Sequence, residues 1–168
     1  HWYKQQAIKL YLMDTLDSDQ FLIQDCDVAC IKPFSIFEKD VVPVFRIESL
    51  WNEYHGVYAN AVHGLLGMNR IVECSFVTEM MPYNKSDWIQ CRNLIQDRFK
   101  QSWIQAIPNF HPLDSTKWFS EYELLGIFKT NHDSNWSAIY DDHPVVNSWE
   151  DFYSANWTDV PTIKFKAR

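Results

Sequence analysis

The sequence predicts an α/β fold, in which short apolar strands alternate with long helices. Two observations support this prediction. Three stretches carry residues at three- and four-residue steps, the spacing of a helix that buries one face: residues 2–16, 47–66 and 85–107. A fourth helix is expected to begin near Phe119, where residues 120–123 have the spacing of a helix start. Four short apolar runs are typical of strands: residues 21–23, 41–45, 75–78 and 160–165.

Capping residues predict where the helices begin and end. Gly67 follows the second helix, at the position where a left-handed residue commonly closes a helix. Asn84 precedes the third helix as a candidate N-cap, and Pro108 is expected to stop that helix. Ser120 and Glu123 have the spacing of a capping box at the start of the fourth helix.

Proline and aspartate positions give the limits of the strands. The run at 21–23 is too short for a helix and stops at Asp25, which predicts a buried strand with acids at its end. Pro43 lies within the second run, so that run is expected to form an edge strand. Pro82 is expected to end the strand that begins at Ser75.

Composition limits the class of protein. The 168 residues are 46% hydrophobic, which is enough to form a core, so we expect one domain over residues 1–168. Its final part, residues 131–168, is a polar and aromatic tail of uncertain assignment. A formal charge of −7 disfavours nucleic acid as a partner. The sequence shows no apolar run of membrane-spanning length, no secretory signal and no paired cysteine motif, so a cytoplasmic location with reduced thiols is expected.

The motif Asp25-Cys26-Asp27 carries the clearest chemical signal. Side chains two residues apart on an extended chain point the same way, so both carboxylates can face one ion. Ligands gather beyond the carboxyl ends of strands in open α/β sheets. Hard cations such as Mg²⁺ or Mn²⁺ prefer such oxygen ligands, together with substrate phosphates. The alternative is that two aspartates near a turn are simply solvated loop residues.

Residues 21–28 (FLIQDCDV), followed by Ile31-Lys32-Pro33-Phe34, resemble the strand–DxD–strand unit of GT-A glycosyltransferases. More particularly, they are similar to a poorly characterised family of predicted nucleotide-diphospho-sugar transferases of bacteria and viruses. Three further segments fit that family in the same order: residues 2–10 (WYKQQAIKL), 75–82 (SFVTEMMP) and 119–126 (FSEYELLG). The resemblance extends to about residue 132.

The resemblance implies a GT-A-like sheet flanked by helices and a metal-dependent transferase. Asp25 and Asp27 would hold Mn²⁺ or Mg²⁺ against the diphosphate of a nucleotide-sugar donor, whose sugar passes to a carbohydrate or other hydroxyl acceptor. A later His or acid often completes such a metal site, and His132 is the candidate here. The simpler interpretation of His132 is a surface residue just past a helix.

Candidate acceptor-side residues lie in the segments that follow. Glu121 and Glu79 are candidate catalytic bases, each able in principle to deprotonate an attacking hydroxyl. Thr78 and Tyr122 are candidate substrate-binding residues for sugar hydroxyls, and Trp118 is a candidate to stack on a sugar. Glu123 is more simply explained by its capping position, and Trp51, Trp88 and Trp103 are most simply core.

One departure from the family pattern concerns the N-terminal side. A complete GT-A domain begins with a strand–helix region that binds the nucleotide base, and we expect that part to lie upstream of His1. Another chain or a removed segment would then complete the domain, or the protein would bind sugar nucleotides poorly. The alternative function is therefore a non-catalytic GT-A-like remnant, a binding or structural module in a larger assembly. A metal-dependent phosphoesterase ranks last, because a second ion would need more clustered acids.

Overall fold

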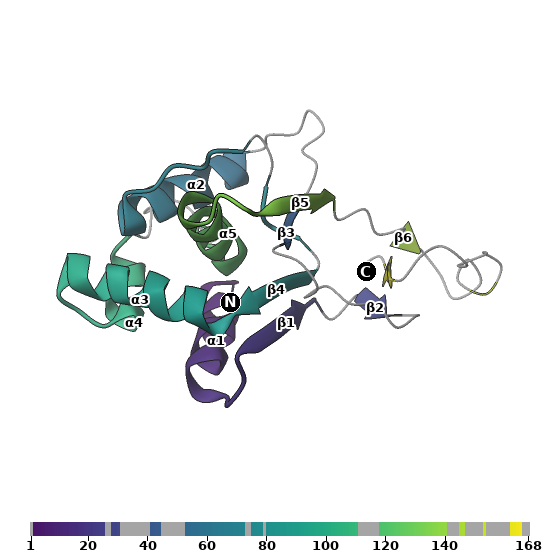
Figure 1. Ribbon diagram of the computed structural model, residues 1–168, viewed down its shortest axis with the longest axis horizontal. Coiled ribbons are helices and arrows are strands. Elements are labelled where there is room, and N and C mark those ends of the chain that lie inside the picture. Colours follow the sequence, from purple (N-terminus) through teal and green to yellow (C-terminus); the bar gives the residue numbers. More distant parts are fainter. Residues whose placement is uncertain are drawn as a thin grey trace.

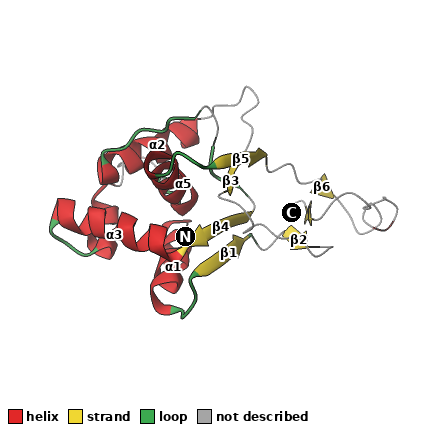
Figure 2. Cartoon of the chain, in the orientation of Figure 1, coloured by secondary structure: helices red, strands yellow, loops and turns green. Residues whose placement is uncertain are grey.

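The structure, a computed structural model of residues 1–168, is an α/β arrangement of helices and short strands (Figures 1 and 2). It describes residues 2–25, 28–30, 41–44, 53–72, 75–78, 80–110, 118–140, 145–146, 153 and 162–165. The helices are α1 (Trp2–Thr15), α2 (Glu53–Leu66), α3 (Lys85–Phe99), α4 (Trp103–Ala106), the 3₁₀ helix η1 (Ile107–Phe110) and α5 (Glu121–His132). The strands are β1 (Gln20–Gln24), β2 (Val28–Cys30), β3 (Val41–Val44), β4 (Met80–Asn84), β5 (Ser137–Tyr140), β6 (Val145–Val146) and β7 (Thr162–Phe165).

The described strands form three small sheets. β1 pairs with β4 in antiparallel fashion, with Leu22 opposite Pro82. β3 and β5 form a parallel pair, while β7 lies between antiparallel β2 and parallel β6. Within the described residues β3 therefore has an edge position, as Pro43 predicts. β1 and β7 confirm the strands predicted at 21–23 and 160–165. The prediction that the first of these strands is buried was wrong, because β1 pairs only with β4 among the described residues and leaves Leu22 39% exposed.

The strand predicted at 75–78 is displaced in the structure. Ser75 forms an isolated bridge, and regular pairing begins only at Met80 and continues through Pro82. The physical reason is that Phe76 donates its backbone N–H to the Glu123 carboxylate, at 3.1 Å, instead of to a strand. Pro82 does not end the strand, because β4 is paired on one side only among the described residues, and an edge strand tolerates proline.

The helix predictions are confirmed at one boundary and wrong at another. Gly67 closes α2 with φ at 74° and donates its N–H to the His63 carbonyl, at 2.7 Å. The single helix expected at 85–107 is broken, because Lys100 adopts a left-handed φ of 52° after Phe99. Pro108 does not stop this region but lies within η1. The apolar spacing concealed the break because α3 and α4 bury residues in the same core. Residues 47–52 lie outside the described part of the chain.

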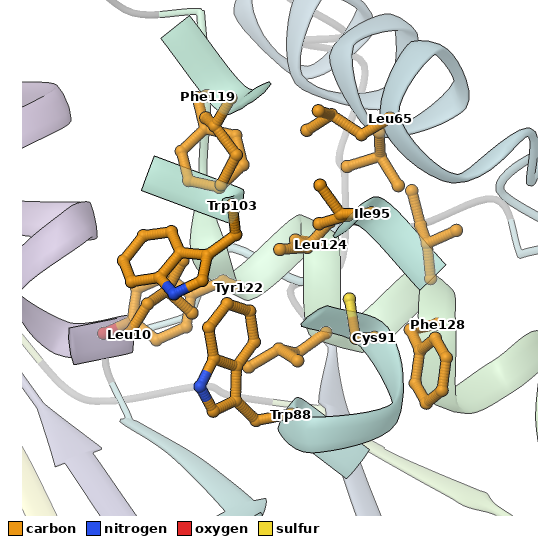
Figure 3. Packing of buried hydrophobic residues seen from close by; sticks show 14 of the residues in the cluster. Leu10, Leu65, Trp88, Cys91, Ile95, Trp103, Phe119, Tyr122, Leu124 and Phe128 are labelled. Carbon is orange, nitrogen blue, oxygen red and sulfur yellow. The ribbon is translucent and has the colours of Figure 1, made fainter. Parts of the chain in front are cut away.

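Helix α5 lies at the centre of the core (Figures 1 and 3). Every residue from Glu121 to Phe128 is buried, which is the pattern of a helix enclosed by other elements on all sides. Gly126 permits this close packing, because a Cβ atom there would lie 2.2 Å from the Phe76 ring. The core around α5 includes Leu10, Leu65, Trp88, Ile95, Trp103, Phe119, Leu124 and Phe128 (Figure 3).

A partly buried polar connection joins α1 to α3 and α4. The Asp14 carboxylate accepts hydrogen bonds from the indole N–H groups of Trp88, at 2.7 Å, and Trp103, at 3.1 Å. Arg92 forms an ion pair with the same carboxylate at 2.7 Å. The two tryptophans are therefore core residues, as predicted, and their N–H groups are satisfied by one acid. Trp51 lies outside the described residues.

The outer face of α1 is apolar and exposed. Ile8, Tyr11 and Leu12 of the helix, and Leu16 directly after it, have exposures between 43% and 58%. Long apolar side chains grouped in this way often mark a surface that contacts another polypeptide. None of the helices in the described ranges has both the length and the apolar character needed to cross a membrane.

Candidate functional site

The first acid of the motif lies directly after β1, where the strand leads it out of the sheet. The Asp25 side chain is about one-third exposed, at 33%, so one side of its carboxylate faces solvent. Its Oδ1 atom faces inward, toward Lys9 and the Tyr122 hydroxyl. Cys26 and Asp27 lie outside the described residues.

Lys9 is at the centre of a polar cluster that joins three separate segments. Its ammonium Nζ lies 2.8 Å from Glu121 Oε1, 3.1 Å from the Tyr122 hydroxyl and 3.5 Å from Asp25 Oδ1. The same ammonium is 4.3 Å from the centre of the Tyr122 ring. With only 13% of the Lys9 side chain exposed, these contacts replace most of the water that a lysine normally binds.

The packing of α1 explains why Lys9 reaches this position. Leu10 and Met13 are fully buried in the core, which fixes the rotation of the helix about its axis. Gln6, one turn before Lys9, is also buried and lies against Glu121. The indole N–H of Trp2 donates to the Phe119 carbonyl at 2.6 Å, which ties the start of α1 to the segment before α5.

Glu121 is a completely buried carboxylate. Burial raises its pKa to about 7, and the nearby Lys9 ammonium offsets only part of this rise. Gln6 also contacts the carboxylate: with its amide nitrogen turned toward Glu121, it donates to both oxygens. The side chain has no exposed surface, so an acceptor hydroxyl at the protein surface does not meet this carboxylate directly.

Two stacked tyrosines form the inner wall of the cluster. The Tyr122 hydroxyl donates to Asp25 Oδ1 at 3.2 Å, and its ring stacks on Tyr83 with the ring centres 6.4 Å apart. The Tyr83 hydroxyl is buried and makes no hydrogen bond within the described part of the chain. Burial raises its pKa well above the usual value, and the nearby Glu121 carboxylate adds to that rise.

Glu123 belongs to a second buried ion pair, separate from Lys9. Its carboxylate lies 2.8 Å from the Arg70 guanidinium and accepts hydrogen bonds from the Ser75 hydroxyl, at 2.8 Å, and the Phe76 N–H. Burial raises its pKa. Ser120 is the N-cap of α5, as predicted, and accepts from the Glu123 N–H at 3.5 Å. The Glu123 side chain, however, joins α5 to residues 70–76 instead of completing the capping box.

The remaining candidates lie in different surroundings. The Thr78 hydroxyl is buried and donates to the Met80 carbonyl at 2.8 Å. Trp118 is 1% exposed and stacks on Tyr3, so its ring packs inside the protein and is not a surface platform for a sugar. The Thr78 and Trp118 contacts are thus made within the protein itself. Glu79 lies outside the described residues.

His132 is not brought beside Asp25. It is the last residue of α5, about 15 Å along the helix axis from Tyr122, which contacts Asp25. Its ring stacks on Phe128 with the centres 4.1 Å apart, and its Nδ1 lies 3.0 Å from the Phe128 carbonyl. These contacts of His132 are therefore with Phe128, one turn earlier on α5, and not with Asp25.

The cluster fits a hard cation in part. Asp25 offers a partly exposed carboxylate oxygen, the ligand type that Mg²⁺ and Mn²⁺ prefer alongside substrate phosphates. No group of three acids, histidines or cysteines able to hold a metal occurs among the described residues. A cation here would thus rely on Asp25, on ligands outside the described ranges and on the substrate. Lys9 already places a positive charge 3.5 Å from Asp25, and this charge opposes a second cation.

Lys9 and Gln6 were not identified from the sequence, although a signal for them exists. Both lie on the side of α1 that carries the buried residues Leu10 and Met13. Two long polar side chains one turn apart on a core-facing surface require buried partners. That requirement points to an acid elsewhere in the core, which the structure identifies as Glu121.

The fold and site define an α/β protein with a partly buried, charged cluster at the end of a strand. The chain belongs to the DUF6492 family, described as a family of unknown function, whose model matches residues 1–155. No curated protein and no solved structure showed significant similarity to the chain.

Proposed function

We propose that the chain is the metal-binding and acceptor-side part of a GT-A-type glycosyltransferase. It would transfer a sugar from a nucleotide-diphosphate donor to a hydroxyl acceptor. The observation that carries the proposal is the position of Asp25. This residue follows β1 directly, exposes one side of its carboxylate and has its inner oxygen held by Tyr122 and Lys9. A carboxylate oriented in this way at a strand end is suited to bind a cation that carries a diphosphate.

The meeting of separate segments supports the same proposal. The three segments at 2–10, 21–28 and 119–126 carry the resemblance to nucleotide-diphospho-sugar transferases. Lys9, Asp25 and Tyr122 come from these three segments in turn, and their polar atoms lie within 3.5 Å of one another. The fourth segment, at 75–82, contacts α5 through the carboxylate of Glu123. Residues that resemble one family thus converge on one cluster.

Asp25, together with Asp27, would hold Mn²⁺ or Mg²⁺, and the ion would neutralise the charge that develops on the diphosphate leaving group. Tyr122 fixes the Asp25 carboxylate by donating a hydrogen bond to its inner oxygen. Glu121 is completely enclosed, so it is better suited to balance the Lys9 charge than to receive a proton from an acceptor. Glu79 remains the candidate base, as a proposal from the sequence.

We would incubate the chain with Mn²⁺ and a panel of nucleotide sugars, and measure release of the nucleoside diphosphate. Release that requires Mn²⁺ and disappears in Asp25→Ala supports the proposal. Release that is insensitive both to chelation and to this substitution would refute the role of Asp25.

A second candidate function is a non-catalytic binding module, favoured by the outer face of α1. Ile8, Tyr11, Leu12 and Leu16 present exposed apolar side chains there, which a protein partner could cover. Substituting Leu12 with Glu would disrupt such a contact and leave the polar cluster intact. Substituting Ile104, a half-exposed residue of α4, with Glu is the matched control. A partner that co-purifies with the natural chain and with Ile104→Glu, but not with Leu12→Glu, would favour the binding module.

A further inference from the structure

The ammonium group of Lys9 lies between the candidate metal ligand and a buried acid. Nζ is 2.8 Å from Glu121 Oε1 but 3.5 Å from Asp25 Oδ1. Glu121 is the more buried of the two acids, with 0% of its side chain exposed against 33% for Asp25. Attraction between charges grows as the distance falls and as water is excluded. The ammonium therefore rests against Glu121 and contacts Asp25 more weakly.

This arrangement affects any cation that approaches Asp25. A divalent ion on that carboxylate would lie a few ångström from the Lys9 charge and would be repelled by it. With the effective dielectric constant of a protein surface, repulsion between charges at about 4 Å is sufficient to change an affinity by about tenfold or more. The carboxylate of Glu121 limits this repulsion by holding the ammonium 2.8 Å from its own Oε1 atom, closer to Glu121 than to Asp25.

We propose that Lys9 and Glu121 form a counter-charge pair that regulates cation binding at Asp25. Glu121 holds the ammonium back, and an ammonium that is released from Glu121 occupies the place of the cation at Asp25. Glu121 is then a positioning residue that acts through Lys9, and Lys9 is a tethered competitor of the metal. The inference rests on the proposed metal-dependent function and specifies how its metal site is regulated.

Two further contacts are consistent with this division of roles. The Tyr122 hydroxyl lies 3.1 Å from the ammonium and donates to Asp25 at 3.2 Å, so it can remain bound to the carboxylate whether or not Lys9 reaches it. Gln6 lies against Glu121 and supports the buried carboxylate. The ammonium is the mobile charge in this picture, because a lysine carries its charge on a flexible four-carbon stem, whereas Glu121 is fully enclosed.

A double-mutant cycle on Mn²⁺ affinity, measured by calorimetry without nucleotide, tests the inference. Lys9→Met removes the competing charge and should bind Mn²⁺ about tenfold more tightly than the natural chain, or better. Glu121→Gln releases Lys9 toward Asp25 and should weaken Mn²⁺ binding by a similar factor. The double variant should bind like Lys9→Met alone, because Glu121 acts only through Lys9. A loss caused by Glu121→Gln that persists when Lys9→Met is also present would overturn the inference, since Glu121 would then act on the metal directly.

Glu123→Gln is the matched control for the loss of a buried ion pair on the same helix. Glu123 pairs with Arg70 instead of Lys9, so this variant should leave Mn²⁺ affinity unchanged. If Lys9→Met does not fold, as judged by near-ultraviolet circular dichroism, Lys9→Gln provides a second neutral side chain that keeps a hydrogen-bond donor. If neither folds, unchanged Mn²⁺ affinity in folded Glu121→Gln still overturns the inference.

The outcomes separate this inference from the proposed function. Mn²⁺ binding by the natural chain that is unaffected by Lys9→Met supports the metal site and overturns the counter-charge pair. Binding by Lys9→Met alone supports the counter-charge pair and contradicts a metal-dependent activity of the natural chain. Absence of Mn²⁺ binding in every folded variant overturns both.

Discussion

Substituting Glu121 with Gln should change how the stability of the protein depends on pH. Burial raises the pKa of Glu121 from 4.5 to about 7 in the folded protein, and the unfolded chain restores the ordinary value. Between these two pH values the folded state binds the proton that the unfolded state has released. The contribution of Glu121 to stability is therefore greatest below pH 4.5, and this contribution is lost as the pH rises to about 7.

The size of the effect follows from the same shift. Each unit of pKa difference corresponds to about 1.4 kcal/mol, so the natural chain should lose about 3 kcal/mol from this group across that interval. The glutamine introduced by Glu121→Gln keeps the shape of the side chain but does not titrate. The free energy of unfolding of this variant, relative to the natural chain, should accordingly rise by about 3 kcal/mol between about pH 4.5 and about pH 8.

Urea unfolding at a series of pH values, followed by tryptophan fluorescence, measures this difference. Asp97→Asn, which removes an exposed carboxyl group on α3, is the control for a general change in net charge. Its stability profile should run parallel to that of the natural chain. Parallel profiles for Glu121→Gln and the natural chain would refute the reasoning, because they would show that Glu121 titrates normally in the folded protein.

Two further predictions concern the core. Asp14→Ala leaves the indole N–H groups of Trp88 and Trp103 without their acceptor. This variant should lower the free energy of unfolding, measured in urea, by about 2 to 4 kcal/mol. A loss below about 0.5 kcal/mol would show that these hydrogen bonds contribute little. Gly126→Ala improves helix propensity by up to about 1 kcal/mol but places a Cβ atom 2.2 Å from Phe76. Overpacking should dominate with a net loss of about 1 to 3 kcal/mol, and a thermal midpoint above that of the natural chain would contradict it.

The sequence predicted those parts of the fold that depend on local patterns. The helical spacing located α1, the N-cap Ser120 located the start of α5, and the left-handed Gly67 closed α2 as its type and position indicated. The predictions from the sequence failed where long-range contacts override the local pattern. Phe76 gives its N–H to Glu123, so pairing begins only at Met80. Such a contact spans distant segments and leaves no periodic trace in either one.

The same distinction applies to the candidate site. The motif of Asp25 was apparent because an apolar strand leads directly to it. The sequence did not predict the position of Lys9 in this site, because the role of a lysine on a helix depends on which buried acid it contacts in the folded protein. The capping spacing of Glu123 was also misleading, since Ser120 caps α5 without help from the Glu123 side chain. The proposed GT-A function rests on the sequence resemblance and on the cluster around Asp25.

The most direct test of the central claim is binding of Mn²⁺ and then UDP, measured by calorimetry beside an Asp25→Ala/Asp27→Ala double variant. The proposed function predicts that the natural chain binds UDP only when Mn²⁺ is present. The double variant should remain folded and lose both signals. A folded natural chain that binds neither ligand, or a double variant that binds both as tightly as the natural chain, would contradict a metal-dependent nucleotide-sugar site at Asp25.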